Sequence, residues 1–197
     1  MLNRLSYIFL LGTLALLAVL YIAYNRQDEA PARYMGIDRC RVCHEAASSG
    51  AQTKVWLRSA HSRAYQALES DSAKTIIAKL GGTNADCLRC HTTLGRAPQN
   101  EIERHLTMEG VSCERCHGPG SNYAYHEIMR HRSSFTAEGG VVGSLRDCYQ
   151  CHAASVATDS AHCPFQYTDF NADSAWLQVR HPLPANPTRP DTAVELR

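Results

Sequence analysis

The chain has 197 residues, with 20 Lys and Arg against 19 Asp and Glu and a formal net charge of +1. This balance excludes a nucleic-acid binder that relies on a large excess of positive charge. Nine cysteines and ten histidines accompany a hydrophobic content of only 44%. Side chains of the usual core types are therefore few, and we expect something other than side chains to fill the interior.

The first predicted element is an apolar segment from Leu5 to Tyr24 that contains no charged residue. Such a segment is long enough to cross a bilayer as one helix. A cleaved signal peptide is the alternative, but the bulky end of the segment and the missing Ala-x-Ala site favour an uncleaved anchor. A short basic N-terminus normally stays in the cytoplasm. We therefore expect residues 1–30 to anchor the chain in the inner membrane, with the remainder in the periplasm, or to be removed from a periplasmic protein.

The next feature is the motif C-x-x-C-H, which occurs four times and uses eight of the nine cysteines. Two thiols at this spacing can add to the two vinyl groups of one haem, and the following His then lies beneath the iron as its proximal ligand. The motif predicts four covalently attached c-type haems. The attachment residues are Cys40 and Cys43, Cys87 and Cys90, Cys113 and Cys116, and Cys148 and Cys151, and the proximal ligands are His44, His91, His117 and His152.

Zinc held by paired C-x-x-C units and a disulfide framework are the alternative uses of these cysteines. Neither explains a His directly after every pair, so the motif favours covalent haem. Four haems on residues 40–152 leave fewer than 30 residues per porphyrin. The haems themselves are therefore expected to be the core.

Between and after the motifs, the pattern predicts short helices and loops and no convincing strand. Residues 54–69 have apolar positions at helical spacing, with His61 on the same face. A second helix is expected to begin at Ser70 or Asp71 and to run to Leu80, before Gly81-Gly82.

Two further helices are expected in the second half of the chain. After the turn 118–120, Ser121 is expected to cap a helix that carries Tyr125, His126 and Met129. A last helix is expected to begin at Asn171 or Asp173 and to end at His181, because Pro182 disfavours helical geometry there. Residues 182–197 are rich in proline and are expected to form an extended or disordered tail.

The predicted fold is thus mainly α-helical with extensive loops. A compact multihaem cytochrome c domain, residues 31–181, is expected to wrap around four haems and to follow an N-terminal transmembrane helix.

Six histidines lie outside the motifs, and they decide the chemistry of the iron. A second His gives a low-spin centre suited to electron transfer, whereas a vacant position can bind a small molecule. No motif is followed closely by Met, which argues against the membrane-anchored tetrahaem quinol dehydrogenases. His131 and His162 are expected to be surface residues, and Cys163 a buried, inert thiol.

The chain resembles the tetrahaem cytochrome c-554 family, electron carriers associated with hydroxylamine oxidation, over residues 34–152. The likeness rests on Tyr34-Met35-Gly36, on residues 56–61, and above all on the string G-V-S-C-E-R-C-H-G-P-G at 110–120. The resemblance implies that His61, His126 and His181 are distal ligands. It also implies that the haem on His91 has no sixth protein ligand. His105 is a competing candidate for that position and has no family counterpart.

These features favour a membrane-tethered carrier that passes electrons between redox partner proteins, rather than an enzyme, with no nucleic-acid partner. One alternative is an enzyme that converts a small nitrogen species, such as nitric oxide, at a five-coordinate second haem. This activity requires that His105 does not bind the iron of the second haem. The other alternative is a quinol-oxidising subunit docked to a membrane complex, for which the anchor is the only support.

Overall fold

The computed structural model describes residues 3–25, 30–81, 83–152 and 170–181. The chain divides into two compact units, Met1–Pro31 and Ala32–Arg197, which are taken separately below. His162, Cys163 and the Pro-rich tail lie outside the described residues, so the predictions for them stay predictions.

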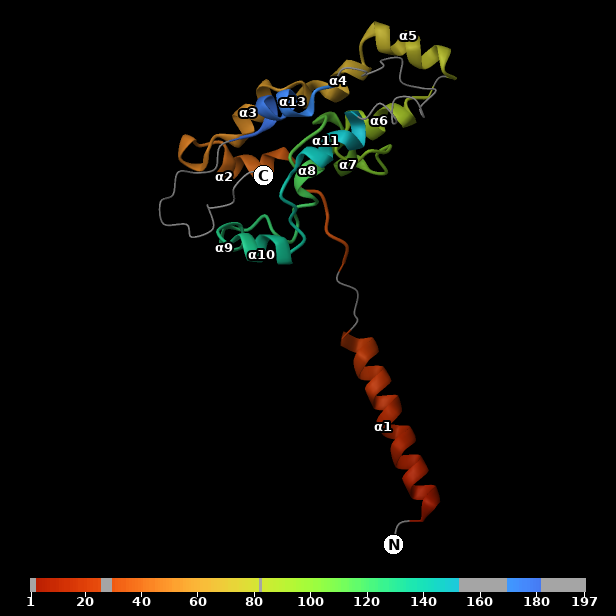
Figure 1. Cartoon of the computed structure of the whole chain (residues 1–197). Coiled ribbons are helices and arrows are strands. Elements are labelled where there is room, and N and C mark those ends of the chain that lie inside the picture. The colour runs from red at the N-terminus through yellow and green to blue at the C-terminus, as the bar shows by residue number, and fades with distance from the viewer. Residues whose placement is uncertain (1–2, 26–29, 82, 153–169, 182–197) are drawn as a thin grey trace. The chain divides into compact units, whose positions relative to one another are not determined.

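The first unit contains one helix, α1 (Arg4–Asn25), drawn in red in Figure 1. Its described apolar side chains are exposed, including Phe9 and Tyr21. Within the described residues, no helix has the combined length and apolar character of a membrane span. The predicted transmembrane helix is therefore not confirmed.

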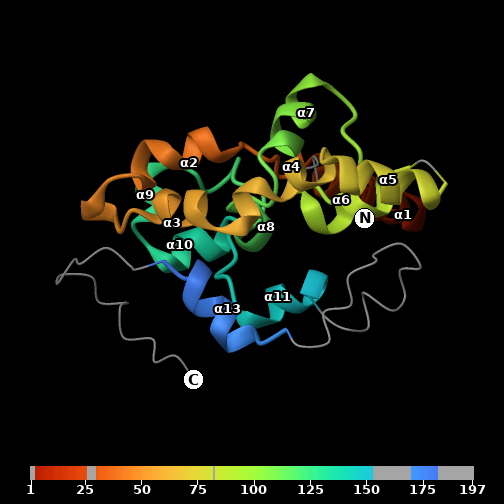
Figure 2. The ribbon, with the colours of Figure 1, turned by 90° about the horizontal axis from the view of Figure 1, so that it is seen from above.

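The second unit is helical, and the described residues contain no strand, which confirms the predicted mainly α-helical class. Helix α13 lies against α3 and α11, while α4 lies against α6 and α7, as Figure 2 shows. The helices are α2 (Ile37–His44), α3 (Gln52–Arg58), α4 (Ala64–Leu68), α5 (Asp71–Lys79), α6 (Ala85–His91), α7 (Glu101–Met108), α8 (Glu114–His117), α9 (His126–Met129), α10 (Arg132–Ala137), α11 (Leu145–His152) and α13 (Ala172–Val179), with 3-10 turns at Ala47–Ser49 and Ala60–Arg63.

The side-chain core of this unit is thin. Among the described residues, the largest side chains that are almost completely buried are three threonines, Thr53, Thr92 and Thr93. Large apolar residues are instead often exposed, such as Val42 within the first motif. This agrees with the low hydrophobic content of the sequence. The described residues of this unit do not form the close-packed aliphatic interior that holds most domains of this size together.

The sequence predicts one continuous helix over residues 54–69, and this prediction is wrong. The structure breaks it at Ser59, whose backbone is extended (φ −74°, ψ 160°) and whose hydroxyl donates to the Trp56 carbonyl at 2.7 Å. A 3-10 turn follows, in which the His61 carbonyl accepts a hydrogen bond from Val111 N–H at 3.0 Å. A tertiary contact thus overrides the local periodicity, and His61 lies on a turn between two helices.

The predicted first residue is confirmed for two of the other helices and wrong for a third. Ser70 caps α5 as predicted, because its hydroxyl accepts from Ala73 N–H, and Asn171 caps α13. Ser121 caps no helix: it accepts from Arg33 N–H at 2.8 Å, and α9 begins only at His126. Helix α13 ends at Val179, so His181 lies two residues beyond it rather than within its last turn.

Candidate haem-binding site

Each of the four motifs occupies the end of a helix. Helices α2, α6, α8 and α11 all have the histidine of a motif as their last residue. Positions i, i+3 and i+4 share one face of a helix, so each motif directs both thiols and the imidazole to the same side. None of the eight motif cysteines forms a disulfide. This arrangement has the donor set that covalent haem requires.

The thiols of different motifs meet in two pairs. The Cys40 and Cys113 thiols lie close enough to couple, which raises the pKa of Cys40 and lowers that of Cys113. Cys90 and Cys151 couple in the same way, and this contact together with nearby arginines lowers the pKa of Cys151 to about 6. The first motif therefore adjoins the third, and the second adjoins the fourth. We call these the first–third pair and the second–fourth pair.

Two predicted distal histidines lie opposite predicted proximal ones. The ring centroids of His61 and His152 are 6.1 Å apart, and those of His117 and His181 are 5.9 Å apart. A metal–imidazole bond is about 2.0 Å long, and the ring centroid lies about 1 Å behind the bound nitrogen. Two imidazoles on opposite sides of one iron therefore have centroids about 6 Å apart. Both ring pairs fit the two axial ligands of a haem iron.

The chemical state of these imidazoles suits metal binding. Burial lowers the pKa of His61, His152 and His181, to about 4 for His181. A lowered pKa keeps the ring neutral, which is the form that binds a metal. The Nδ1 of His181 is buried without a hydrogen-bond partner in the described part of the chain.

Backbone carbonyls orient two of the proximal histidines. His91 Nδ1 lies 2.7 Å from the Ala64 carbonyl, and His117 Nδ1 lies 2.8 Å from the Val141 carbonyl. A hydrogen bond at Nδ1 fixes the tautomer and leaves Nε2 for a metal. These carbonyl partners have no signal in the sequence, because a backbone oxygen belongs to every residue type.

Residues 110–112 position His61. Val111 N–H donates to the His61 carbonyl, and the Val111 carbonyl accepts from the Trp56 indole at 2.8 Å. Thr93, which follows the second motif, donates through N–H to the Gly110 carbonyl at 2.8 Å. A Cβ on Gly110 (φ +74°) would lie 2.6 Å from the His61 oxygen. Gly110 is therefore required for the close approach of this segment to the turn that carries His61.

Two carboxylates fasten the first motif to the third. Glu114, only 3% exposed, accepts from Met35 N–H at 2.9 Å, from Gly36 N–H at 2.8 Å and from Gly120 N–H at 2.7 Å. Glu109 accepts from Ile37 N–H at 3.1 Å, at the first turn of α2. These bonds explain why the strings 34–36 and 110–120 occur in the same chain.

The structure does not bring His126 or His105 against another imidazole. The His126 side chain is 69% exposed, and its Nδ1 lies 3.2 Å from Glu127. The segment just before His126 contacts α2, because Arg39 of α2 donates to the Ala124 carbonyl at 2.9 Å. His105 is 73% exposed and lies 3.6 Å from Glu101 on its own helix.

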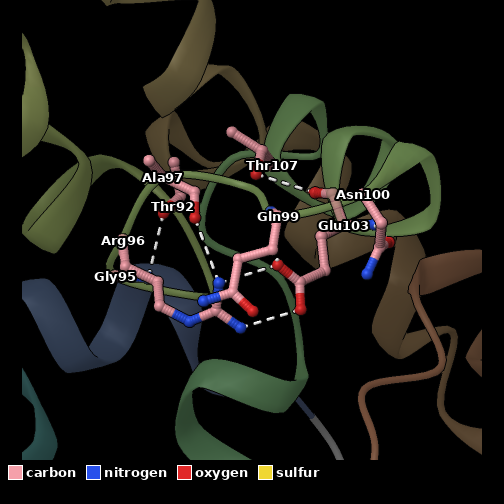
Figure 3. A network of polar contacts seen from close by, with 8 residues as sticks. All are labelled: Thr92, Gly95, Arg96, Ala97, Gln99, Asn100, Glu103 and Thr107. Atoms are coloured by element: carbon pink, nitrogen blue, oxygen red, sulfur yellow. Dashed lines mark hydrogen bonds and ion pairs between the residues drawn. The ribbon is translucent and has the colours of Figure 1, made fainter.

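A polar network fixes α7 and therefore the position of His105 (Figure 3). Arg96 pairs with Glu103 at 2.7 Å, and the hydrogen bond from Arg96 lowers the pKa of Glu103 to about 2. Asn100 caps the helix by accepting from Glu103 N–H at 3.0 Å. The buried face of α7 carries Leu106 and Thr107, so His105 lies on the exposed face. The sequence did not predict this helix.

Comparisons with known proteins agree with this site. Residues 39–118, which include the first three motifs, match the family described as cytochrome c554 and c-prime. A relative named cytochrome c-554, from Nitrosomonas europaea, is 34% identical over 103 residues, which cover 48% of this chain. The chain spans 42% of that relative's length. No solved structure matches the chain.

The motif-bearing helices and the family match make this chain similar to c-type cytochromes, the class of proteins that carry covalently bound haem. The match to the cytochrome c-554 family covers residues 39–118. The fourth motif and His181 lie beyond that match, so they rest on the geometry described above.

Proposed function

We propose that the protein is a tetrahaem electron carrier that accepts electrons from one redox protein and passes them to another. The observation that carries this proposal is the pair of opposed imidazoles at 6.1 Å and 5.9 Å, which suits two six-coordinate irons. Each haem supplies one-electron storage, and axial ligation by two histidines suits transfer rather than substrate binding.

The ligand assignment follows from the ring pairs. His152 and His61 would hold the fourth haem, and His117 and His181 the third. His44 would hold the first haem, and His126 is its favoured distal ligand because the segment before His126 adjoins α2 through Arg39. His91 would hold the second haem.

The thiol contacts support electron transfer between haems. Because Cys40 meets Cys113 and Cys90 meets Cys151, the attachment points of two haems meet within each pair. Arg115, in the third motif, has its Nη2 3.6 Å from the Cys151 sulfur of the fourth motif, so the two pairs also adjoin each other. The chain therefore arranges its four attachment sites as one connected group.

We further propose that residues 1–30 tether this carrier to the inner membrane, with the haem domain in the periplasm. The support is the uncharged sequence from Leu5 to Tyr24 and the exposed apolar side chains of α1. The protein should fractionate with membranes and retain residues 1–30. N-terminal sequencing that begins beyond Tyr24 would show a cleaved signal instead.

A second candidate function is favoured by one observation, the exposed position of His105. With His105 held against Glu101 on the outer face of α7, the second haem would have a vacant sixth position. A small nitrogen species such as nitric oxide could bind there. Binding of carbon monoxide to the reduced protein at about one site per chain would support this function, and binding at no site would exclude it.

The haem count tests the primary proposal. Protein produced in a host that matures c-type haems should retain four haems per chain after acid-acetone extraction, because thioether bonds survive this treatment. Replacement of both Cys113 and Cys116 by Ser should lower the count to three. Four haems in that variant, or fewer than four in the unmodified protein, would contradict the proposal.

A further inference from the structure

Glu114 and Arg115 are adjacent residues of the third motif, and their charged groups lie beside different motifs. The Glu114 carboxylate binds Gly36 N–H at 2.8 Å, and the Cys40 thiol of the first motif donates to the Gly36 carbonyl at 3.6 Å. The Arg115 guanidinium lies instead 3.6 Å from the Cys151 sulfur of the fourth motif. One motif thus places a negative charge at the first–third pair and a positive charge at the second–fourth pair.

At pH 8, above the pKa of about 7 that burial gives Glu109, this second acidic group reinforces the negative charge at the first–third pair. Both oxygens of Glu109 lie 3.1 Å from Ile37 N–H, one residue from the amide that Glu114 binds. Both carboxylates lie close enough to Cys40 and Cys113 to oppose ionisation of either thiol. Because Glu114 is almost completely buried, solvent screens this field less than it would at the surface.

Arginines determine the field at the second–fourth pair. The Arg115 guanidinium lies 3.6 Å from the Cys151 sulfur and also reaches the segment after the second motif, because a Cβ built on Gly95 would lie 3.1 Å from its Nη1. In the described ranges, no carboxylate lies within 4.0 Å of the half-buried Arg115 guanidinium, so no ion pair there offsets its charge. At Cys116 of the third motif, Arg115 and Asp147 act in opposite directions.

We infer that the half-buried Glu109 and the buried Glu114 lower the reduction potentials of the haems on the first and third motifs, while Arg115 raises those of the haems on the second and fourth. Reduction of a ferric haem adds one electron, so a nearby cation favours the ferrous form and a nearby anion the ferric form. Arg115 is thus a tuning residue that acts through charge. The inference rests on the proposed four-haem function.

The first test is the Arg115→Gln variant of the full, haem-loaded chain in a potentiometric titration. At the potential where the second and fourth haems of the unmodified protein are half reduced, the ferrous-to-ferric ratio should fall about tenfold. A tenfold change corresponds to a shift of about 59 mV for a one-electron couple. Arg115→Lys, which keeps the charge, should show a much smaller shift. The matched control is Arg104→Gln, because Arg104 is 64% exposed and paired with Glu101.

The second test removes a negative charge, so the expected shift in reduction potential is upward. Glu109→Gln should raise the potentials of the first and third haems at pH 8, and Glu101→Gln on α7 is its control, since Glu101 is 65% exposed. Variants that lack one pair of motif cysteines identify which haem each potential belongs to. If Arg115→Gln does not accumulate with haem, Arg89→Gln should give a smaller shift in the same direction, because Arg89 is exposed.

The outcomes separate this inference from the proposed function. A haem count below four contradicts the proposed function before any titration begins. Four haems, with potentials that move no more in the Arg115→Gln and Glu109→Gln variants than in their controls, overturn the inference alone. Shifts of both variants in the same direction also overturn it.

Discussion

His61 is the side chain whose role is defined most sharply by geometry. Its ring faces His152 at a centroid distance of 6.1 Å, while covalent attachment at Cys148 and Cys151 does not involve it. His61→Ala should therefore convert one low-spin haem to high spin and leave the number of covalent haems unchanged. Low-temperature electron paramagnetic resonance would measure the conversion. His131→Ala, at an exposed position, is the control; an unchanged spectrum for His61→Ala would remove His61 from the ligand set.

Glu109 should make stability depend on pH. Burial is the main cause that raises its pKa to about 7, against about 4.3 for an unfolded Glu, so the native state holds an extra proton between these values. The contribution of protonated Glu109 to the free energy of unfolding is fully present below about pH 4.3, and it is lost as the pH rises towards 7. Glu109→Gln should match the unmodified protein at pH 4 and exceed it in free energy of unfolding at pH 8. Equal differences at both pH values in guanidinium titrations would contradict this.

Among single residues, the sequence determines which motif side chains share a helix face, but not which of the predicted distal histidines lies near which motif. A C-x-x-C-H motif is local, so its residues meet on any helix that contains them. His61 and His181 were predicted as distal ligands from the family resemblance, and their opposition to His152 and His117 emerges only when α3, α11 and α13 come together. The orienting carbonyls of Ala64 and Val141 could not be predicted, because side-chain identity does not determine them.

Among the structural elements, the 110–112 segment controls the turn that carries His61. Gly110→Ala would introduce a Cβ at φ +74°, 2.6 Å from the His61 carbonyl oxygen. An L-residue in the left-handed region costs about 1–2 kcal/mol, before any steric conflict. We expect Gly110→Ala to lower the free energy of unfolding by at least that amount and to give a partial high-spin signal. Gly139→Ala is the matched control, because its φ of +83° carries the same backbone cost without any close neighbour. Equal spectra for the two variants would contradict the assigned role of Gly110.

Helix termini with capping side chains were predictable, and the interrupted helix was not. Ser70 and Asn171 cap their helices through local hydrogen bonds that the sequence encodes directly. The break at Ser59 depends on Val111, which lies far along the chain and binds the His61 carbonyl. Ser121 was assigned as a cap wrongly for a similar reason, since its hydroxyl accepts instead from Arg33.

For the whole molecule, the thin side-chain core predicts that the second unit depends on its haems. Among the described residues, the largest side chains with essentially no exposed surface are threonines, which contribute little apolar surface. The chain with all eight motif cysteines changed to Ser should therefore lack a cooperative thermal transition and the near-ultraviolet circular dichroism of fixed aromatic side chains. The haem-loaded chain should show both. A cooperative transition in the haem-free variant would contradict a haem-filled core.

The central claim is that four haems are bound and that three of them carry two histidines each. Low-temperature electron paramagnetic resonance of the fully oxidised protein, with a haem count on the same sample, tests it most directly. Our account predicts three low-spin haems and one high-spin haem per chain, the last on His91. Four low-spin haems would show that a side chain such as His105 occupies the second iron, and two or more high-spin haems would contradict the distal assignments of His61, His126 and His181.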